Sequence, residues 1–211
     1  MRSRLEIIVG ILMLTAAGYW IFPGHTWLQS DTQIYVPMLE RLWNPSVLSR
    51  DFMVERPHMA FTIYDEVAVG LRRLTGLGFH QVLALQQFFF RALGLLGVYL
   101  IVSSLGLSRL PALLATGAFA LGATIWGPTV LTIEYEPVPR GFALPLMILA
   151  IGLMARGHPL EAGGAAAVAF LYHGTTAIPY WICAAVLALW PGDRISRRQH
   201  VEALVPLALT G

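Results

Sequence analysis

Residues 162–190, AGGAAAVAFLYHGTTAIPYWICAAVLALW, form an apolar run that is too long for one untilted transmembrane helix. His173 and Gly174 interrupt this run near its middle. A helix needs about 20 apolar residues to cross the hydrocarbon core of a bilayer, so each half of the run is shorter than a full span. We therefore expect two short helices, over 160–172 and 175–190, that turn back on one another at the His-Gly pair.

The composition of the whole chain indicates an integral membrane protein. Of its 211 residues, 56% are hydrophobic and only 12% are charged, and the mean hydropathy is +0.65. Soluble domains carry about twice that share of charge. The formal net charge of +2 is too small to suggest a nucleic-acid partner. A single cysteine, Cys183, excludes an intrachain disulfide and a cysteine-type metal cluster.

The remaining apolar runs predict an all-α, polytopic membrane bundle of about six to seven spans. We expect further spans over 5–22, 82–105, 110–126 and 141–155, and a last one from about residue 201. A cleaved signal peptide is the alternative for the first run. No repeat or flexible linker divides the chain, so 1–211 reads as one transmembrane domain. Because the last run is cut short, we expect residues 1–211 to be the N-terminal portion of a longer polypeptide.

Arginines predict the orientation of the bundle. Arg2 and Arg4 precede the first run, and Arg109 and Arg156 lie in short turns that the threading puts on the same side. Positive charge favours the cytoplasmic side, so we expect a cytoplasmic N-terminus. A long loop over 23–80, the loop over 127–140 and the turn at His173 would then face outward. Eight of the 12 acidic residues fall in these outer segments.

The long outer loop opens on an acid that has two interpretations. Ser30, Asp31, Thr32 and Gln33 fit a capping box, which would make Asp31 the first-turn acid of a capped helix. Alternatively, Asp31 is a catalytic base held at a rigid helix end. The loop also contains an amphipathic segment over 61–74, and we expect both helices to lie at the membrane interface.

Other candidate site residues lie further along the outer segments. Four residues within eight positions suit either a site that handles a proton and a phosphate or a solvated, salt-bridged loop: Asp51, Glu55, Arg56 and His58. Glu134 and Glu136 precede Arg140, at the entry to the fourth run, where an arginine is either a phosphate ligand or an interfacial anchor. His173 and Arg91 interrupt apolar runs, where polar groups usually face a cavity or a partner, although His173 also fits a satisfied turn residue.

Three segments resemble the GT-C class of integral-membrane glycosyltransferases, in an uncharacterised bacterial branch. SDTQIYVPMLERLWNPSVLSRDF at 30–52 is similar to the first outer loop of that class, and EYEPVPRGFALPL at 134–146 to a later loop-to-span entry. LEAGGAAAVAFLYHGTTAIP at 160–179 looks like a short-span pair with a histidine at the turn. The acid pair typical of the first loop is absent, because Thr32 follows Asp31. Members usually have about twice as many spans, which again implies an N-terminal portion.

The resemblance implies transfer of a sugar from a polyprenyl-phosphate donor to an acceptor on the outer face of the bacterial inner membrane. Asp31 would be the base, and Arg140, His173 and Arg91 would hold the leaving phosphate. Sugar hydroxyls, or Mg²⁺ or Mn²⁺, would be bound by the other acids and the loop histidine, namely Asp51, Glu55, His58, Glu134 and Glu136. Two other functions remain open. Half of a transporter would place its ionisable groups near the bilayer midplane, and a non-catalytic membrane scaffold would lack a cleft.

Overall fold

The computed structural model describes most of the chain. The described residues are 2–21, 28, 31–55, 62–121, 124–125, 130–131, 134, 136–190, 192 and 194–210. Within them the protein is all-helical, with ten α-helices, one short 3₁₀ helix and one pair of two-residue strands. The predicted all-α class is confirmed.

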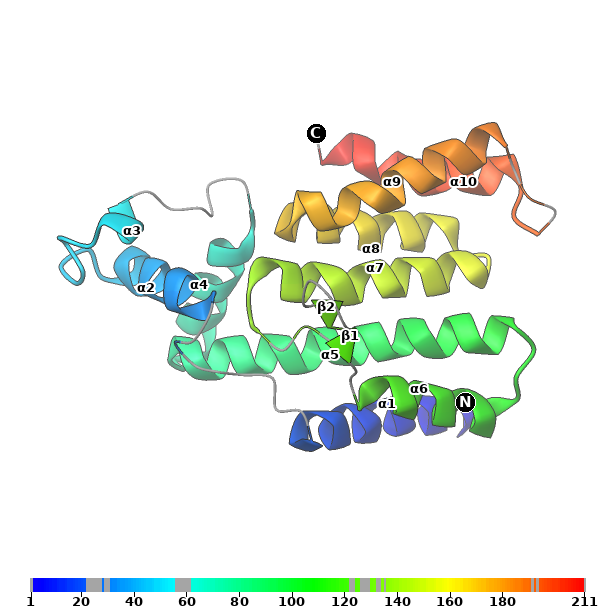
Figure 1. Cartoon of the computed structure of the whole chain (residues 1–211), viewed down its shortest axis with the longest axis horizontal. Helices are drawn as coiled ribbons and strands as arrows, with labels where there is room; N and C mark the ends of the chain where they lie inside the picture. Colours follow the sequence, from blue (N-terminus) through cyan, green and yellow to red (C-terminus); the bar gives the residue numbers. More distant parts are fainter. Residues whose placement is uncertain are drawn as a thin grey trace.

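Six helices of alternating direction run side by side and form the body of the molecule (Figure 1). They are α1 (Arg2–Ile21), α5 (Phe79–Ser104), α6 (Arg109–Ala120), α7 (Pro139–Ala155), α8 (Pro159–Tyr172) and α9 (Gly174–Leu189). In space, α1 and α6 pack on one side of α5, α7 packs on α5, and α8 lies between α7 and α9. Short turns join the antiparallel pairs α5–α6, α7–α8 and α8–α9, whereas α5 and α7 are parallel neighbours with α6 between them in the chain.

The break at His173 lies where the sequence predicts it. Helix α8 ends at Tyr172 and α9 begins at Gly174, with His173 between them in an extended conformation, φ −159° and ψ 93°. The two helices therefore form an antiparallel pair, and the turn lies at the same end of the body as the start of α7 (Figure 1).

A smaller unit of three helices covers this end of the body (Figure 1). It consists of α2 (Thr32–Trp43), α3 (Phe52–Glu55) and α4 (Tyr64–Thr75). Helix α2 ends before Asn44-Pro45, and α4 is amphipathic as predicted, with Tyr64 and Ala68 fully buried. The guanidinium of Arg72 lies 4.5 Å from the ring centre of Trp43 and 3.1 Å from Glu40 on α2. Arg72 thus joins α4 to α2.

The closest approach within the body joins α5 to α7. A Cβ atom on Gly97 would lie 2.6 Å from the backbone of Ile148, and one on Gly152 would lie 2.5 Å from the carbonyl oxygen of Gly97. Without side chains at these two positions the backbones come into direct contact, as small residues allow in membrane helix pairs. This contact holds the two helices whose outer ends carry the candidate site.

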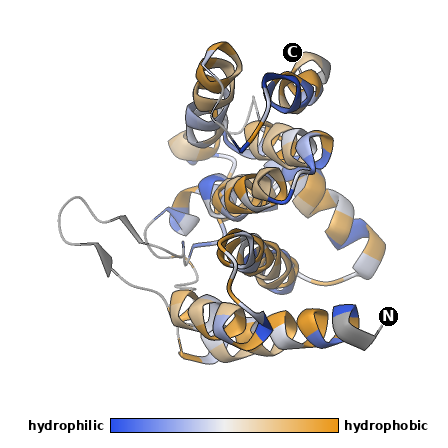
Figure 2. Cartoon of the chain, turned by 90° about the vertical axis from the view of Figure 1, so that its right-hand side faces the viewer, coloured by the Kyte–Doolittle hydropathy of each residue, from blue (hydrophilic) through white to orange (hydrophobic). Residues whose placement is uncertain are grey.

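The expected six to seven membrane spans are not confirmed. Among the described residues, two helices are long and apolar enough to cross a membrane, α1 over Arg4–Ile21 and α5, while α7 and α9 are apolar but shorter. Several large apolar side chains point outward, for example Met13, Phe89 and Ile182, which are 68%, 59% and 58% exposed. Figure 2 shows that apolar residues predominate along the body helices.

Two predicted spans differ in the structure. The run over 110–126 forms only the 12-residue helix α6, and its later residues Thr124–Ile125 (β1) pair antiparallel with Val130–Leu131 (β2). Gly122 and β-branched residues follow α6 in the sequence, and both disfavour helix. The chain after residue 201 forms the end of α10 (Arg197–Leu204) and a 3₁₀ helix, η1 (Val205–Leu209). Pro206 prevents the α-helix from continuing, because it has no N–H to donate.

Candidate functional site

Asp31 lies directly before the first residue of α2. Its carbonyl oxygen accepts the N–H groups of Ile34 and Tyr35, at 2.9 and 3.2 Å, so its backbone already belongs to the helix start. Its side chain makes no capping bond to the helix. Instead, Oδ2 of Asp31 accepts a hydrogen bond from Nη1 of Arg140 at 2.6 Å. The predicted cap, Ser30, lies outside the described residues.

Arg140 comes from the first turn of α7 and bridges two carboxylates. Pro139 opens the helix with its fixed φ, after Val138 in an extended conformation. From this position Nε of Arg140 donates to Oε2 of Glu134 at 2.8 Å, while Nη1 donates to Asp31. The side chain of Arg140 is 45% exposed, so it also faces solvent. The planar guanidinium presents its N–H donors in a fixed fork, so it holds two oxygen ligands in set directions.

Glu136 is buried behind this ion-pair cluster. It is only 1% exposed, and its Oε2 accepts the backbone N–H of Asp31 at 3.0 Å. Its own N–H donates to Oε1 of Glu134 at 3.2 Å. Asp31, Glu134, Glu136 and Arg140 therefore form one connected cluster, which we call the acidic clamp.

His173 lies close enough to Arg140 to feel its charge. Its Nδ1 is 2.7 Å from Oγ1 of Thr176 and 3.1 Å from Oγ1 of Thr175, so the imidazole is held against the start of α9. Burial, and to a lesser extent the charge of Arg140, lowers the pKa of His173 below its usual 6.5. The imidazole is therefore neutral at pH 7 and able to donate a hydrogen bond without adding charge.

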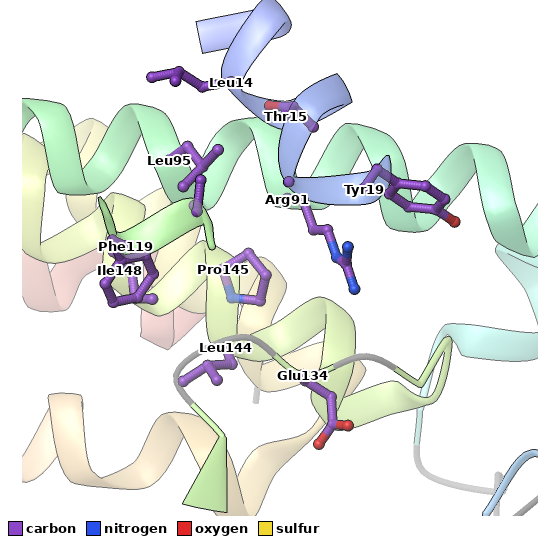
Figure 3. Close-up of a pocket in the computed structure, with 13 residues that line it drawn as sticks. Leu14, Thr15, Tyr19, Arg91, Leu95, Phe119, Glu134, Leu144, Pro145 and Ile148 are labelled. Carbon is purple, nitrogen blue, oxygen red and sulfur yellow. The ribbon is translucent and has the colours of Figure 1, made fainter. Parts of the chain in front are cut away.

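Arg91 lies on α5 and lines a pocket between α1, α5, α6 and α7. Its guanidinium carbon is 4.8 Å from the ring centre of Tyr19, whose hydroxyl donates to Gln87 at 3.0 Å. Arg91, Tyr19 and Glu134 lie on one side of the pocket, and apolar residues such as Pro145 lie on the other (Figure 3). Glu134 thus belongs to both the pocket and the acidic clamp. Tyr19 is a lining residue that the sequence analysis missed, because an aromatic residue near a helix end reads as an interfacial anchor.

The other predicted site residues lie apart from this arrangement or outside the description. Asp51 accepts the N–H of Met53 at 2.9 Å and so begins the short helix α3. For Glu55 the structure describes only the backbone, and His58 lies outside the described residues. The structure brings together Asp31, Glu134, Glu136 and Arg140, with His173 and Arg91 beside them.

Metal binding gains no support from the geometry. Among the described residues, no group of three His, Cys, Asp or Glu side chains is placed to hold a metal ion. The oxygen atoms of the acidic clamp are directed at Arg140 and at the Asp31 amide. These residues do not fit a Mg²⁺ or Mn²⁺ site, which would need several oxygen atoms around one point.

Comparisons with known proteins add no relative. No family model, curated protein or solved structure matches the chain.

Proposed function

We propose that this protein is a multi-pass membrane glycosyltransferase that uses a polyprenyl-phosphate-linked sugar. The observation that carries the proposal is the acidic clamp, in which a half-exposed carboxylate, Asp31, lies 2.6 Å from a half-exposed arginine, Arg140. A base and a phosphate ligand are the two groups that such a transfer needs side by side. The cluster lies at one end of a body whose outer faces are apolar, as expected for a site near lipid headgroups.

The lining of the pocket beside Arg91 has the polarity that a lipid-linked donor needs, but its volume of about 30 Å³ holds such a donor only if the helices move apart. Its walls come mainly from apolar side chains of four helices, and its polar groups gather on one side (Figure 3). A polyprenyl phosphate has the same division, with an apolar chain and one anionic head. The phosphate would lie near Arg91 and Arg140, with His173 as a neutral hydrogen-bond donor.

The proposed reaction is a direct displacement at the anomeric carbon. Asp31 accepts the proton of the acceptor hydroxyl, the new bond forms between that oxygen and the anomeric carbon, and the bond to the phosphate oxygen breaks. Polyprenyl phosphate leaves with the electron pair of the broken bond, and the configuration inverts. Arg140 and Arg91 stabilise the charge that develops on the leaving group.

The ion pair between Asp31 and Arg140 suggests the order of events. While Arg140 holds Asp31, Oδ2 of the carboxylate is occupied by the guanidinium N–H. An arriving phosphate competes for the guanidinium, so that donor binding frees Asp31 to accept a proton.

The test is transfer of sugar from a purified polyprenyl-phosphate donor by the full-length gene product in lipid nanodiscs. Replacement of Asp31 by Asn keeps the shape and removes the base, so we expect turnover to fall by about 10²–10⁴-fold. The control is Asp51→Asn, because Asp51 begins a separate short helix and we expect wild-type turnover from that variant. Equal turnover by wild type and Asp31→Asn would remove Asp31 from the mechanism.

A further inference from the structure

Glu136 is a buried carboxylate whose described contacts connect two distant parts of the chain. It is 1% exposed, and it accepts the backbone N–H of Asp31, a residue 105 positions earlier. Burial of a carboxylate is costly unless hydrogen bonds compensate for the lost water. The burial of Glu136 therefore points to a role for the contact that its carboxylate makes.

The segment around Glu136 is fixed from several directions. The carbonyl of Glu136 accepts the N–H of Val138 at 2.9 Å, and the carbonyl of Pro137 accepts the buried Tyr64 hydroxyl at 2.8 Å. Residue 141 is glycine, and a Cβ there would lie 2.3 Å from the carbonyl oxygen of Glu136. These contacts leave Glu136 little freedom to move, so its carboxylate is a fixed acceptor.

Asp31 is consequently held at two points. Arg140 holds its side chain and Glu136 holds its backbone. The contact with Glu136 does not involve Arg140, so it persists when the guanidinium turns to a phosphate. The backbone of Asp31 then stays in place while its carboxylate is released.

We propose that Glu136 is a positioning residue that fixes the backbone of Asp31 during sugar transfer, and this inference rests on the proposed function. It replaces the expectation that Glu136 binds sugar or metal. The property that matters is the place of an oxygen acceptor, not its negative charge. Misplacement of a reacting group by about 1 Å can cost 10²-fold in rate.

Two variants of Glu136 distinguish the position of its side-chain oxygen from its negative charge. Glu136→Gln keeps the length of the side chain and an amide oxygen that can accept the Asp31 N–H, but it removes the charge. Glu136→Asp keeps the charge and withdraws the oxygen by one methylene. We expect Glu136→Gln to retain kcat within about threefold, and Glu136→Asp to lose about 10–100-fold in kcat with the donor KM within about twofold.

A second measurement does not depend on activity. Hydrogen exchange of the backbone amides of 31–36, in nanodiscs, reports whether the start of α2 is still held. We expect faster exchange in Glu136→Asp and wild-type exchange in Glu136→Gln, with both variants keeping the wild-type unfolding temperature within a few degrees.

The outcomes distinguish this inference from the proposed function. If wild type transfers no sugar, the proposed function fails, but the exchange rates still show whether Glu136 holds Asp31. If Glu136→Gln is as damaging as Glu136→Asp, or more so, the charge matters and the positioning role is wrong. Wild-type kcat and wild-type exchange in both variants would also overturn it.

Discussion

The ion pair of Asp31 with Arg140 contributes little to the stability of the fold. The two side chains are 36% and 45% exposed, and such surface pairs stabilise proteins by about 0–1 kcal/mol. Loss of the pair in Asp31→Asn should therefore leave the fold intact. We expect Asp31→Asn to change stability little and turnover strongly. A loss of turnover in this variant would therefore not be explained by unfolding.

Asp65, on α4, is a half-buried carboxylate outside the candidate spans. Its Oδ1 is buried without a hydrogen-bond partner among the described residues. Burial, followed by the neighbouring Glu66, raises the pKa of Asp65 from 3.8 to about 6. Because the pKa is higher in the folded state, the folded protein holds this proton more tightly. The stabilisation of the folded state that comes from the protonated Asp65 is complete below about pH 4 and is lost as the pH rises through 6.

Asp65→Asn should remove this pH dependence. We expect the variant to be more stable than wild type at pH 7 by about 1 kcal/mol, allowing for solvent screening of the carboxylate. At pH 4 the two proteins should unfold at the same temperature. The measurement is thermal unfolding in detergent between pH 4 and 8. A companion variant, Glu66→Gln, should lower the pKa of Asp65 and weaken the pH dependence without abolishing it, because burial is the larger cause of the shift. Parallel pH curves for wild type and Asp65→Asn would contradict the prediction.

At the scale of the elements, the contact between α5 and α7 is sensitive to side-chain size. Gly97→Ala would place a methyl group 2.6 Å from the backbone of Ile148, and backbone cannot yield as a flexible side chain does. We expect the variant to lose about 1–3 kcal/mol of stability, as overpacked cores do.

The matched control is Gly164→Ala on α8, where an added Cβ has no neighbour within 4 Å. Alanine is the better helix former, so this variant should be neutral or more stable by up to about 1 kcal/mol. Thermal unfolding of both variants in the same detergent checks the pair. A Gly97→Ala variant as stable as Gly164→Ala would show that the helices are not in backbone contact.

At the scale of the whole molecule, the alternating helices place two sets of turns at opposite ends. The turn at His173 and the acidic clamp lie at one end, and the ion pair between Glu6 and Arg109, at 2.7 Å, lies at the other (Figure 1). In a membrane, these ends would face opposite sides.

Single-cysteine labelling tests this arrangement. In a Cys183→Ser background, a cysteine at Thr175 should react with an impermeant maleimide added outside intact cells. A cysteine at Leu107, an exposed residue at the other end, should react only after the cells are opened. Outside labelling at both positions would contradict the multi-pass topology, and the reverse pattern would place the N-terminus outside.

Helix boundaries were largely predictable, because local chemistry determines them. The end of α2 at Asn44-Pro45, the start of α7 at Pro139 and the turn at His173 follow from neighbouring residues. Helix α6 was predicted too long. Its apolar run continues past residue 121, and apolar character alone does not distinguish a helix from a strand pair.

The candidate site was predictable as residue types, not as contacts. Asp31, Arg140 and His173 stood out as polar groups beside apolar runs, but no pattern paired Asp31 with Arg140 across 109 positions. The burial of Glu136 was likewise unexpected, since glutamate next to proline in a loop normally faces solvent.

The sequence by itself determined the helical class, the apolar faces and most helix ends. These features depend on the hydrophobic pattern and on backbone preferences, and both are set by residues that are close together in the chain. Only the tertiary structure decided which ends meet. The acidic clamp forms because the packing of α5 on α7 and the docking of α2 to α4 carry Asp31 to the first turn of α7. Such pairing depends on the sum of many long-range contacts, and no local pattern encodes that sum.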